Sequence, residues 1–191
     1  MVRNDERRAE LADAGIRVLA RDGARGLSHR AVDAAATAPP GTTSNYFRTR
    51  AALLDALVTR IGERLAPDPA VQEAFRGRAP DRELFRDYIR DIVARLGTER
   101  DVTLALFELR LEAARRPDVA AVLGGWLRAG LDGDVAFNLS AGLPGGRAEI
   151  VLLHYAIDGL LLDRLTTSID PETAAEEAAD LLVDRLLGSP S

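Results

Sequence analysis

Residues Ser28–Arg50 read SHRAVDAAATAPPGTTSNYFRTR, and this stretch decides the fold. Ser28 is a good N-cap, because its hydroxyl can accept a hydrogen bond from a free backbone N–H at a helix start. The alanine-rich run 31–36 then predicts a short helix. Two prolines interrupt it, because proline lacks an N–H and restricts the residue before it. Since proline is tolerated in a first turn, Pro40–Phe47 predicts a second short helix.

Two short helices joined by a tight turn are typical of a helix-turn-helix, whose second helix enters the DNA major groove. Small polar side chains cover most of the second helix and would let it approach bases and phosphates closely. They are Thr42, Thr43, Ser44 and Asn45. Tyr46, Arg48 and Arg50 follow and offer a phenol and two guanidiniums to a phosphate backbone. The alternative, from spacing alone, is an ordinary helical hairpin with a solvated face.

Residues 5–65 resemble the DNA-binding region of the TetR family of bacterial transcriptional regulators. The matching residues, in order, are Leu11, Ala14, Gly23, Ser28, Arg30, Ala31, Val32, Ala36, Gly41, Thr42, Tyr46, Phe47, Arg50, Leu53 and Leu54. The chain departs from the family at the turn. Thr37 stands where a glycine is usual, Ala38 where a larger aliphatic residue is usual, and Pro39 in place of the capping serine. Arg50 replaces a lysine, which keeps the charge but not the contact geometry.

The resemblance implies double-stranded DNA with a palindromic operator as the partner, and it assigns roles in this sequence. The base-contacting residues would be Arg30, Pro40, Gly41 and Ser44. The phosphate-contacting residues would be Ser28, Thr42, Tyr46 and Arg50. Arg30 has the hydrogen-bond geometry to read guanine. Thr43 and Phe47 are expected to face the core of the module.

Apolar residues recur at helical spacing along the rest of the chain, and no stretch alternates with period two for long enough to be a strand. The predicted helices are 4–22, 51–65, 81–96, 99–116, 117–137, 147–165 and 171–187, with one further turn at 71–75. Gly124, Gly125, Gly130 and Gly133 predict a broken or mobile helix at 117–137, and Pro171 suits a first turn. The expected fold is all-α: an N-terminal three-helix helix-turn-helix module plus a C-terminal helical ligand-binding and dimerisation bundle.

Three parts of the chain are expected to have separate roles. They are a helix-turn-helix DNA-binding domain at 1–50, a connecting helix at 51–66, and a helical ligand-binding and dimerisation domain at 67–191. Residues 1–50 hold nine arginines against six acids, so they carry +3, while the whole chain carries −5. A basic N-terminal module on an acidic body fits a protein that presents one end to nucleic acid.

In TetR-like proteins the C-terminal helices enclose a small-molecule pocket. The candidates on those helices here are Phe85, Tyr88, Phe107, Glu108, Trp126 and His154. The polar members are favoured, because a pocket needs a few oriented polar groups in apolar walls. The alternative is that these residues are core, or a salt-bridged surface in the case of Glu108. The resemblance also implies a homodimer through the helices 147–165 and 171–187, against the alternative that these faces pack only within one chain.

The sequence does not predict an enzyme. His154 and Asp158 lie one helical turn apart, but no serine elbow accompanies them, and His29 cannot be paired with His154 from sequence. The turn 143–147 is glycine-rich but lacks the Walker lysine. With no cysteine there is neither a disulfide nor a thiolate metal site. We therefore expect no catalytic residue, no metal and no cofactor.

No apolar run precedes the charged start, and the longest apolar clusters are too short to span a bilayer, so we expect a cytoplasmic protein with no membrane contact. The sequence predicts a TetR-like DNA-binding regulator, a repressor released from a palindromic operator by an unknown small-molecule effector. The alternatives are a helix-turn-helix dimer with no ligand response and, third, an enzyme.

Overall fold

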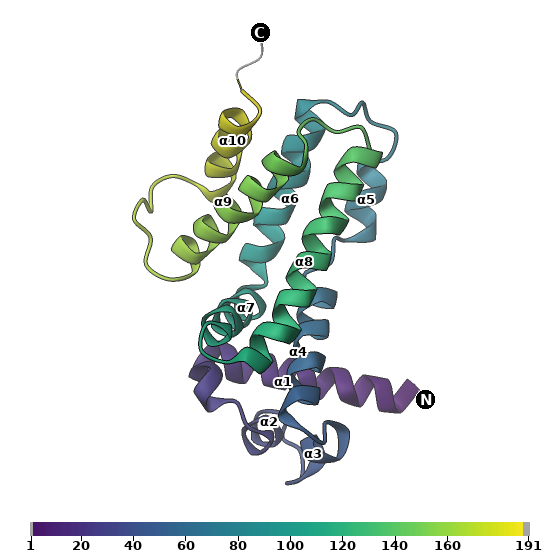
Figure 1. Cartoon of the computed structure of the whole chain (residues 1–191), viewed down its shortest axis with the longest axis vertical. Coiled ribbons are helices and arrows are strands. Elements are labelled where there is room, and N and C mark those ends of the chain that lie inside the picture. The colour runs from purple at the N-terminus through teal and green to yellow at the C-terminus, as the bar shows by residue number, and fades with distance from the viewer. Residues whose placement is uncertain (1, 189–191) are drawn as a thin grey trace. The chain divides into compact units, whose positions relative to one another are not determined.

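The computed structural model describes residues 2–188, and these residues form ten helices and no strand (Figure 1). The helices are α1 (Val2–Gly26), α2 (His29–Ala35), α3 (Thr42–Tyr46), α4 (Arg50–Arg64), α5 (Pro69–Phe75), α6 (Arg82–Thr98), α7 (Arg100–Ala113), α8 (Pro117–Ser140), α9 (Arg147–Leu165) and α10 (Ala175–Leu186). The prediction of an all-α fold is confirmed. Within the described residues, no helix combines the length and apolar character needed to cross a membrane.

Contacts divide the chain into two units. The first holds the residues up to Ala66 together with Glu99–Trp126, and the second holds Pro67–Thr98 and the residues from Leu127 on. The functional boundaries expected at residues 50 and 66 stay a prediction.

The first unit is built on α1, which packs against α2, α4 and α7. The apolar side chains of α1 are buried together with those of the helices that follow. This burial of apolar surface supplies most of the stability of so small a module. The core includes Leu11, Ala14, Val18, Leu19, Leu27, Val32, Phe47, Leu53, Leu54 and Leu57. Thr43 and Phe47 are both buried, as predicted.

The turn between α2 and α3 uses left-handed backbone at two residues. The Ser28 hydroxyl caps α2 by accepting the Ala31 N–H at 3.1 Å. After α2, Thr37 has φ 51°, at the position where the family usually has glycine. Gly41 then has φ 89° and begins α3, a conformation that glycine adopts without steric cost. The predicted helix-turn-helix is confirmed.

In the second unit, α6 and α9 pack together and α10 packs on both. Buried apolar residues line these contacts, among them Leu84, Phe85, Ile89, Val93, Leu153, Ile157, Leu161, Ala179 and Val183. Arginines one turn apart on α6 also pair with acids on α10. Arg86 reaches Asp184 at 2.6 Å, and Arg90 holds both oxygens of Asp180 at 2.7 and 2.6 Å.

Two expectations about the later helices are wrong. The glycine-rich segment is not broken, because α8 runs unbroken from Pro117 to Ser140. The last helix begins at Ala175 and not at Pro171, because side chains at the end of α9 hold the preceding segment as a loop. Asp163 accepts the Ile169 N–H at 2.8 Å, and Arg164 donates to the Asp170 carbonyl at 2.5 Å.

Candidate nucleic-acid interface and ligand site

The four residues predicted to contact bases lie close together in the helix-turn-helix, and all four are exposed. Arg30 lies in the first turn of α2, Pro40 and Gly41 precede α3, and Ser44 lies within it. The Ser44 hydroxyl donates to the Gly41 carbonyl at 2.9 Å, so its oxygen keeps its lone pairs for an outside donor. The turn therefore presents a guanidinium, exposed backbone and a hydroxyl to solvent.

The four predicted phosphate contacts have internal partners or partial cover. Ser28 caps α2 and Thr42 donates to the Pro39 carbonyl at 2.6 Å, while Tyr46 is half-buried. Arg50 is turned inward. Its guanidinium donates to the Leu27 carbonyl at 2.8 Å and to the Ala24 carbonyl at 3.3 Å. Arg50 thus links the start of α4 to the last turn of α1 and to the residue that follows α1.

A buried carboxylate that was not predicted as a site residue, Asp33, organises the start of α3. Asp33 is only 4% exposed. It accepts the Gly41 N–H at 2.8 Å, the Thr43 N–H at 2.7 Å and the Thr43 hydroxyl at 2.5 Å. Burial by itself raises the pKa of Asp33, but the hydrogen bonds from Thr43 and Gly41 outweigh it and hold that pKa below its usual value. Asp33 is therefore an ionised acceptor.

Two arginines of α1 also brace the module, and neither was predicted to do so. Arg8 donates to the Tyr46 carbonyl at 3.1 Å and lies 4.8 Å from the centre of the Phe47 ring. Arg17 donates to the Ala35 carbonyl at 3.2 Å. Both therefore satisfy carbonyls at the C-terminal ends of α2 and α3, where a cation is favourable. The sequence shows only that α1 has a charged face, so these partners could not be read from it.

The six predicted pocket residues divide between the two units. In the first unit, Phe107 and Glu108 are half-buried on α7, and Glu108 accepts the Ala24 N–H at 3.4 Å. Trp126 packs against α4 at Gly62, where an added Cβ would lie 3.0 Å from the indole nitrogen. Glu108 therefore contacts α1, and Trp126 contacts α4.

In the second unit, Phe85 is a core residue with 2% exposure. Tyr88 meets two aromatic rings edge-on, Phe75 at 4.7 Å and Phe137 at 5.3 Å between ring centres. His154 lies 3.0 Å from a carboxylate oxygen of Asp134 on α8. The aromatic group on α5, α6 and α8 is the most concentrated set of ring contacts within the described residues.

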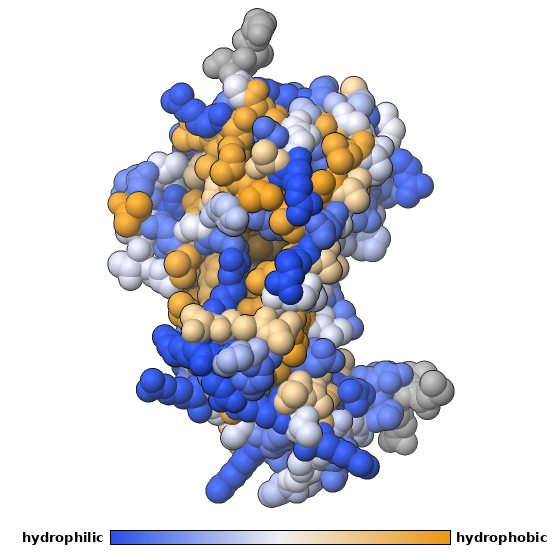
Figure 2. Space-filling model, in the orientation of Figure 1, coloured by the Kyte–Doolittle hydropathy of each residue, from blue (hydrophilic) through white to orange (hydrophobic). Residues whose placement is uncertain are grey.

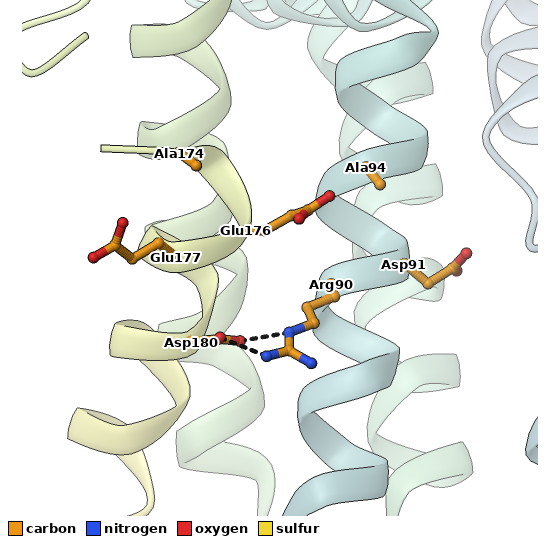
Figure 3. A pocket seen from close by; sticks show the side chains of 7 residues that line it. All are labelled: Arg90, Asp91, Ala94, Ala174, Glu176, Glu177 and Asp180. Atoms are coloured by element: carbon orange, nitrogen blue, oxygen red, sulfur yellow. Dashed lines mark hydrogen bonds and ion pairs between the residues drawn. The ribbon is translucent and has the colours of Figure 1, made fainter. Parts of the chain in front are cut away.

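A pocket of about 520 Å³ opens between α6 and the start of α10 (Figure 3). It is lined by Arg90, Asp91, Ala94, Ala174, Glu176, Glu177 and Asp180. None of the predicted ligand residues lines it. Its side chains are mostly charged, and Arg90 and Asp180 already pair across it, as Figure 3 shows. No aromatic or large aliphatic side chain lines it, whereas such side chains predominate in typical small-molecule sites.

The face of α9 away from the core keeps large apolar side chains at the surface. Leu152, Tyr155 and Leu162 recur at helical spacing and are 50%, 67% and 47% exposed. Leu181 on α10 is also exposed. Figure 2 shows apolar residues along the course of α9, between hydrophilic ones. Contiguous exposed apolar patches are typical of interaction surfaces.

The chain is similar to a known family and to several solved structures. Residues 80–189 match the family model described as "Tetracyclin repressor-like, C-terminal domain". The multidrug binding protein EbrR, complexed with imidazole, is 32% identical and covers 97% of each chain with a TM-score of 0.64. EbrR is also known in complexes with malachite green and with ethidium.

A member of the TetR family from Streptomyces coelicolor A3 is 32% identical, with 96% of this chain and 99% of that chain covered and a TM-score of 0.69. FadR from Bacillus subtilis in complex with stearoyl-CoA is 17% identical, with 95% and 98% covered and a TM-score of 0.71, and it supports the fold alone. Comparison with curated proteins gives no match.

Proposed function

The chain belongs to the TetR family of transcriptional regulators, and on this premise we propose that it is a dimeric repressor, released from a palindromic operator by a small molecule. Family membership makes it a regulator and not an enzyme. The observation that carries the DNA-reading part of the proposal is the exposed group of Arg30, Pro40, Gly41 and Ser44 at the helix-turn-helix.

Arg30 would read a guanine, because a guanidinium donates two parallel hydrogen bonds to O6 and N7. Gly41 and Ser44 would meet neighbouring base edges, where the absence of long side chains permits close approach. Ser28, Thr42 and Tyr46 would hold phosphates. Arg50 would join them only through N–H groups that its two carbonyl partners leave unused, since each terminal guanidinium nitrogen carries two hydrogens.

Dimerisation would occur through α9 and α10. The exposed stripe of Leu152, Tyr155 and Leu162, with Leu181 on α10, supports this assignment, because burying it against a second copy removes apolar surface from water. A two-fold pair presents two reading heads. Such heads match palindromic half-sites roughly 34–36 Å apart.

An aromatic cation is the first effector class to test. EbrR is complexed with malachite green and ethidium, and aromatic side chains bind cations through the faces of their rings. Trp126 is the single tryptophan of the chain, so its fluorescence reports binding near it. Titration with malachite green in the absence of DNA should change this fluorescence, and the same titration with the protein–DNA complex should release the duplex. Release requires that the ligand bind the DNA-free state more tightly.

Selection of binding sites from random duplex DNA tests the DNA-binding part. The proposal predicts enrichment of a palindrome, with Arg30→Ala relaxing the preference at one position in each half-site. Failure to enrich any sequence would overturn the operator proposal. The selection could instead enrich a palindrome while no compound of the tested class releases the protein from it. That result would favour the alternative, a helix-turn-helix dimer that does not respond to that class.

A further inference from the structure

Helix α3, on which the proposed DNA contacts depend, is too short to be stable alone. It has five residues, whereas isolated helices become marginally stable only at roughly 12–15 residues. Its N-cap residue is Gly41, which has no side chain to accept the free N–H groups of the first turn. The helix therefore needs an acceptor from elsewhere in the module.

Asp33 supplies that acceptor from the middle of α2. Its carboxylate accepts three hydrogen bonds at the start of α3, from the N–H of the N-cap residue Gly41, the Thr43 N–H and the Thr43 hydroxyl. Burying a carboxylate is unfavourable unless such donors replace water. At 4% exposure, Asp33 thus depends on α3 as much as α3 depends on it.

We propose that Asp33 is a positioning residue that fixes α3 on α2, and that specific DNA affinity depends on it although Asp33 does not face DNA. The proposal rests on the proposed function. Gly41 donates one of the three hydrogen bonds and is itself a predicted base contact, and Ser44 follows Thr43 directly. A loss of the Asp33 hydrogen bonds would move both contacts relative to Arg30 on α2.

Simple electrostatics predicts the opposite sign. DNA is an anion, so removal of a negative charge from a DNA-binding module should strengthen binding to any sequence. Positioning by Asp33 predicts that neutralising it weakens binding to the selected sequence. The sign of the change therefore separates the two ideas.

The first experiment compares Asp33→Asn with Asp22→Asn, using the selected duplex and a scrambled duplex of the same composition. Asp22 is an exposed acid of the same module, paired with Arg21 at 2.6 Å, so it controls for the change in charge. An asparagine at position 33 places an N–H where donors converge, and we expect the affinity for the selected duplex to fall about tenfold or more. Affinity for the scrambled duplex should change by about twofold or less. Asp33→Asn binding the selected duplex as tightly as Asp22→Asn does would overturn the proposal.

A second pair of variants retains the carboxylate and therefore guards against simple loss of folding. Thr43→Val removes the hydroxyl but keeps the N–H, while Thr43→Ser keeps both donors. Thr43→Val should weaken binding to the selected duplex several-fold and Thr43→Ser should bind it nearly as the unchanged chain does. Equal affinity of the two variants would contradict the role of the Thr43 hydroxyl.

A measurement without DNA separates this proposal from the proposed function. Amide hydrogen exchange at Gly41 and Thr43 should be faster in Asp33→Asn by about tenfold or more, while exchange in α4 stays unchanged. If the unchanged chain enriches no DNA sequence, the operator proposal fails and hydrogen exchange still decides whether Asp33 fixes α3. Unchanged exchange at both amides would overturn the positioning role whatever the DNA result.

Discussion

Thr37→Gly should stabilise the protein, because Thr37 holds a backbone conformation that suits glycine. Its φ is 51°, and among residues 2–188 no other non-glycine residue has a positive φ. The Thr37 side chain is exposed, and its N–H donates to the Ala34 carbonyl at 3.2 Å, a bond that glycine would keep. The substitution therefore removes strain without removing a described contact.

The expected gain follows from two opposing terms. Left-handed backbone costs an L-residue about 1–2 kcal/mol, and the substitution removes this cost. Against it, glycine lowers the stability by about 0.5–1 kcal/mol, because it loses more conformational freedom on folding. The net stabilisation is about 0.5–1 kcal/mol. For a chain of this size it raises the midpoint of thermal unfolding by about 1–4 °C. Circular dichroism during heating, with urea unfolding as a second measure, gives the change.

Ala36→Gly is the matched control. It introduces the same residue one position earlier, where φ is −88° and alanine is unstrained. It should lower the free energy of unfolding by about 0.5–1 kcal/mol. The two substitutions should therefore shift the midpoint in opposite directions. A loss of stability in both variants would refute the assignment of strain to Thr37.

Three further predictions concern other parts of the chain. Arg50→Ala should lower the free energy of unfolding in urea by about 1–3 kcal/mol, because it leaves two carbonyls unpaired; no change would mean that these hydrogen bonds do not hold the module. Burial raises the pKa of Asp13, but the hydrogen bonds and charges of Arg60 and Arg64 lower it by more, so the net pKa lies below its usual value. The stability that ionised Asp13 contributes is therefore fully present above the unfolded pKa of 3.8, and it is lost as the pH falls through the lower folded pKa. Asp13→Asn should then lose less free energy of unfolding on acidification than the unchanged chain does. An equal loss in both proteins would contradict this assignment. Tyr155→Glu should shift sedimentation equilibrium towards monomer, since it places a charge on the proposed dimer face, and an unchanged dimer would place the interface elsewhere.

The helical pattern of the fold could be predicted from sequence because long helices bury one face at regular spacing. The helix Arg147–Leu165 has the predicted bounds, since a glycine turn precedes it and polar residues follow it. The start of α10 could not be predicted, because Pro171 is equally suited to a loop and to a first turn. Hydrogen bonds from Asp163 and Arg164 decide between them, and those depend on the folded loop.

The helix-turn-helix itself could be predicted, but not what holds it together. An aspartate in an alanine-rich helix gives no sign that it is buried, and the partners of Asp33 lie eight and ten residues later in the sequence. Likewise, the sequence shows that Arg50 is charged but not whether its side chain points outward or into the module. In the structure it points towards carbonyls of its own module.

Sequence reading by this helix-turn-helix is tested by the affinity of the purified chain for its selected duplex and for a scrambled duplex, measured over a range of salt concentrations. We expect a preference for the selected duplex of about a thousandfold or more near physiological salt, and both affinities should fall as salt weakens the phosphate contacts. Equal affinity for the two duplexes at every salt concentration would contradict the claim that this helix-turn-helix reads a DNA sequence.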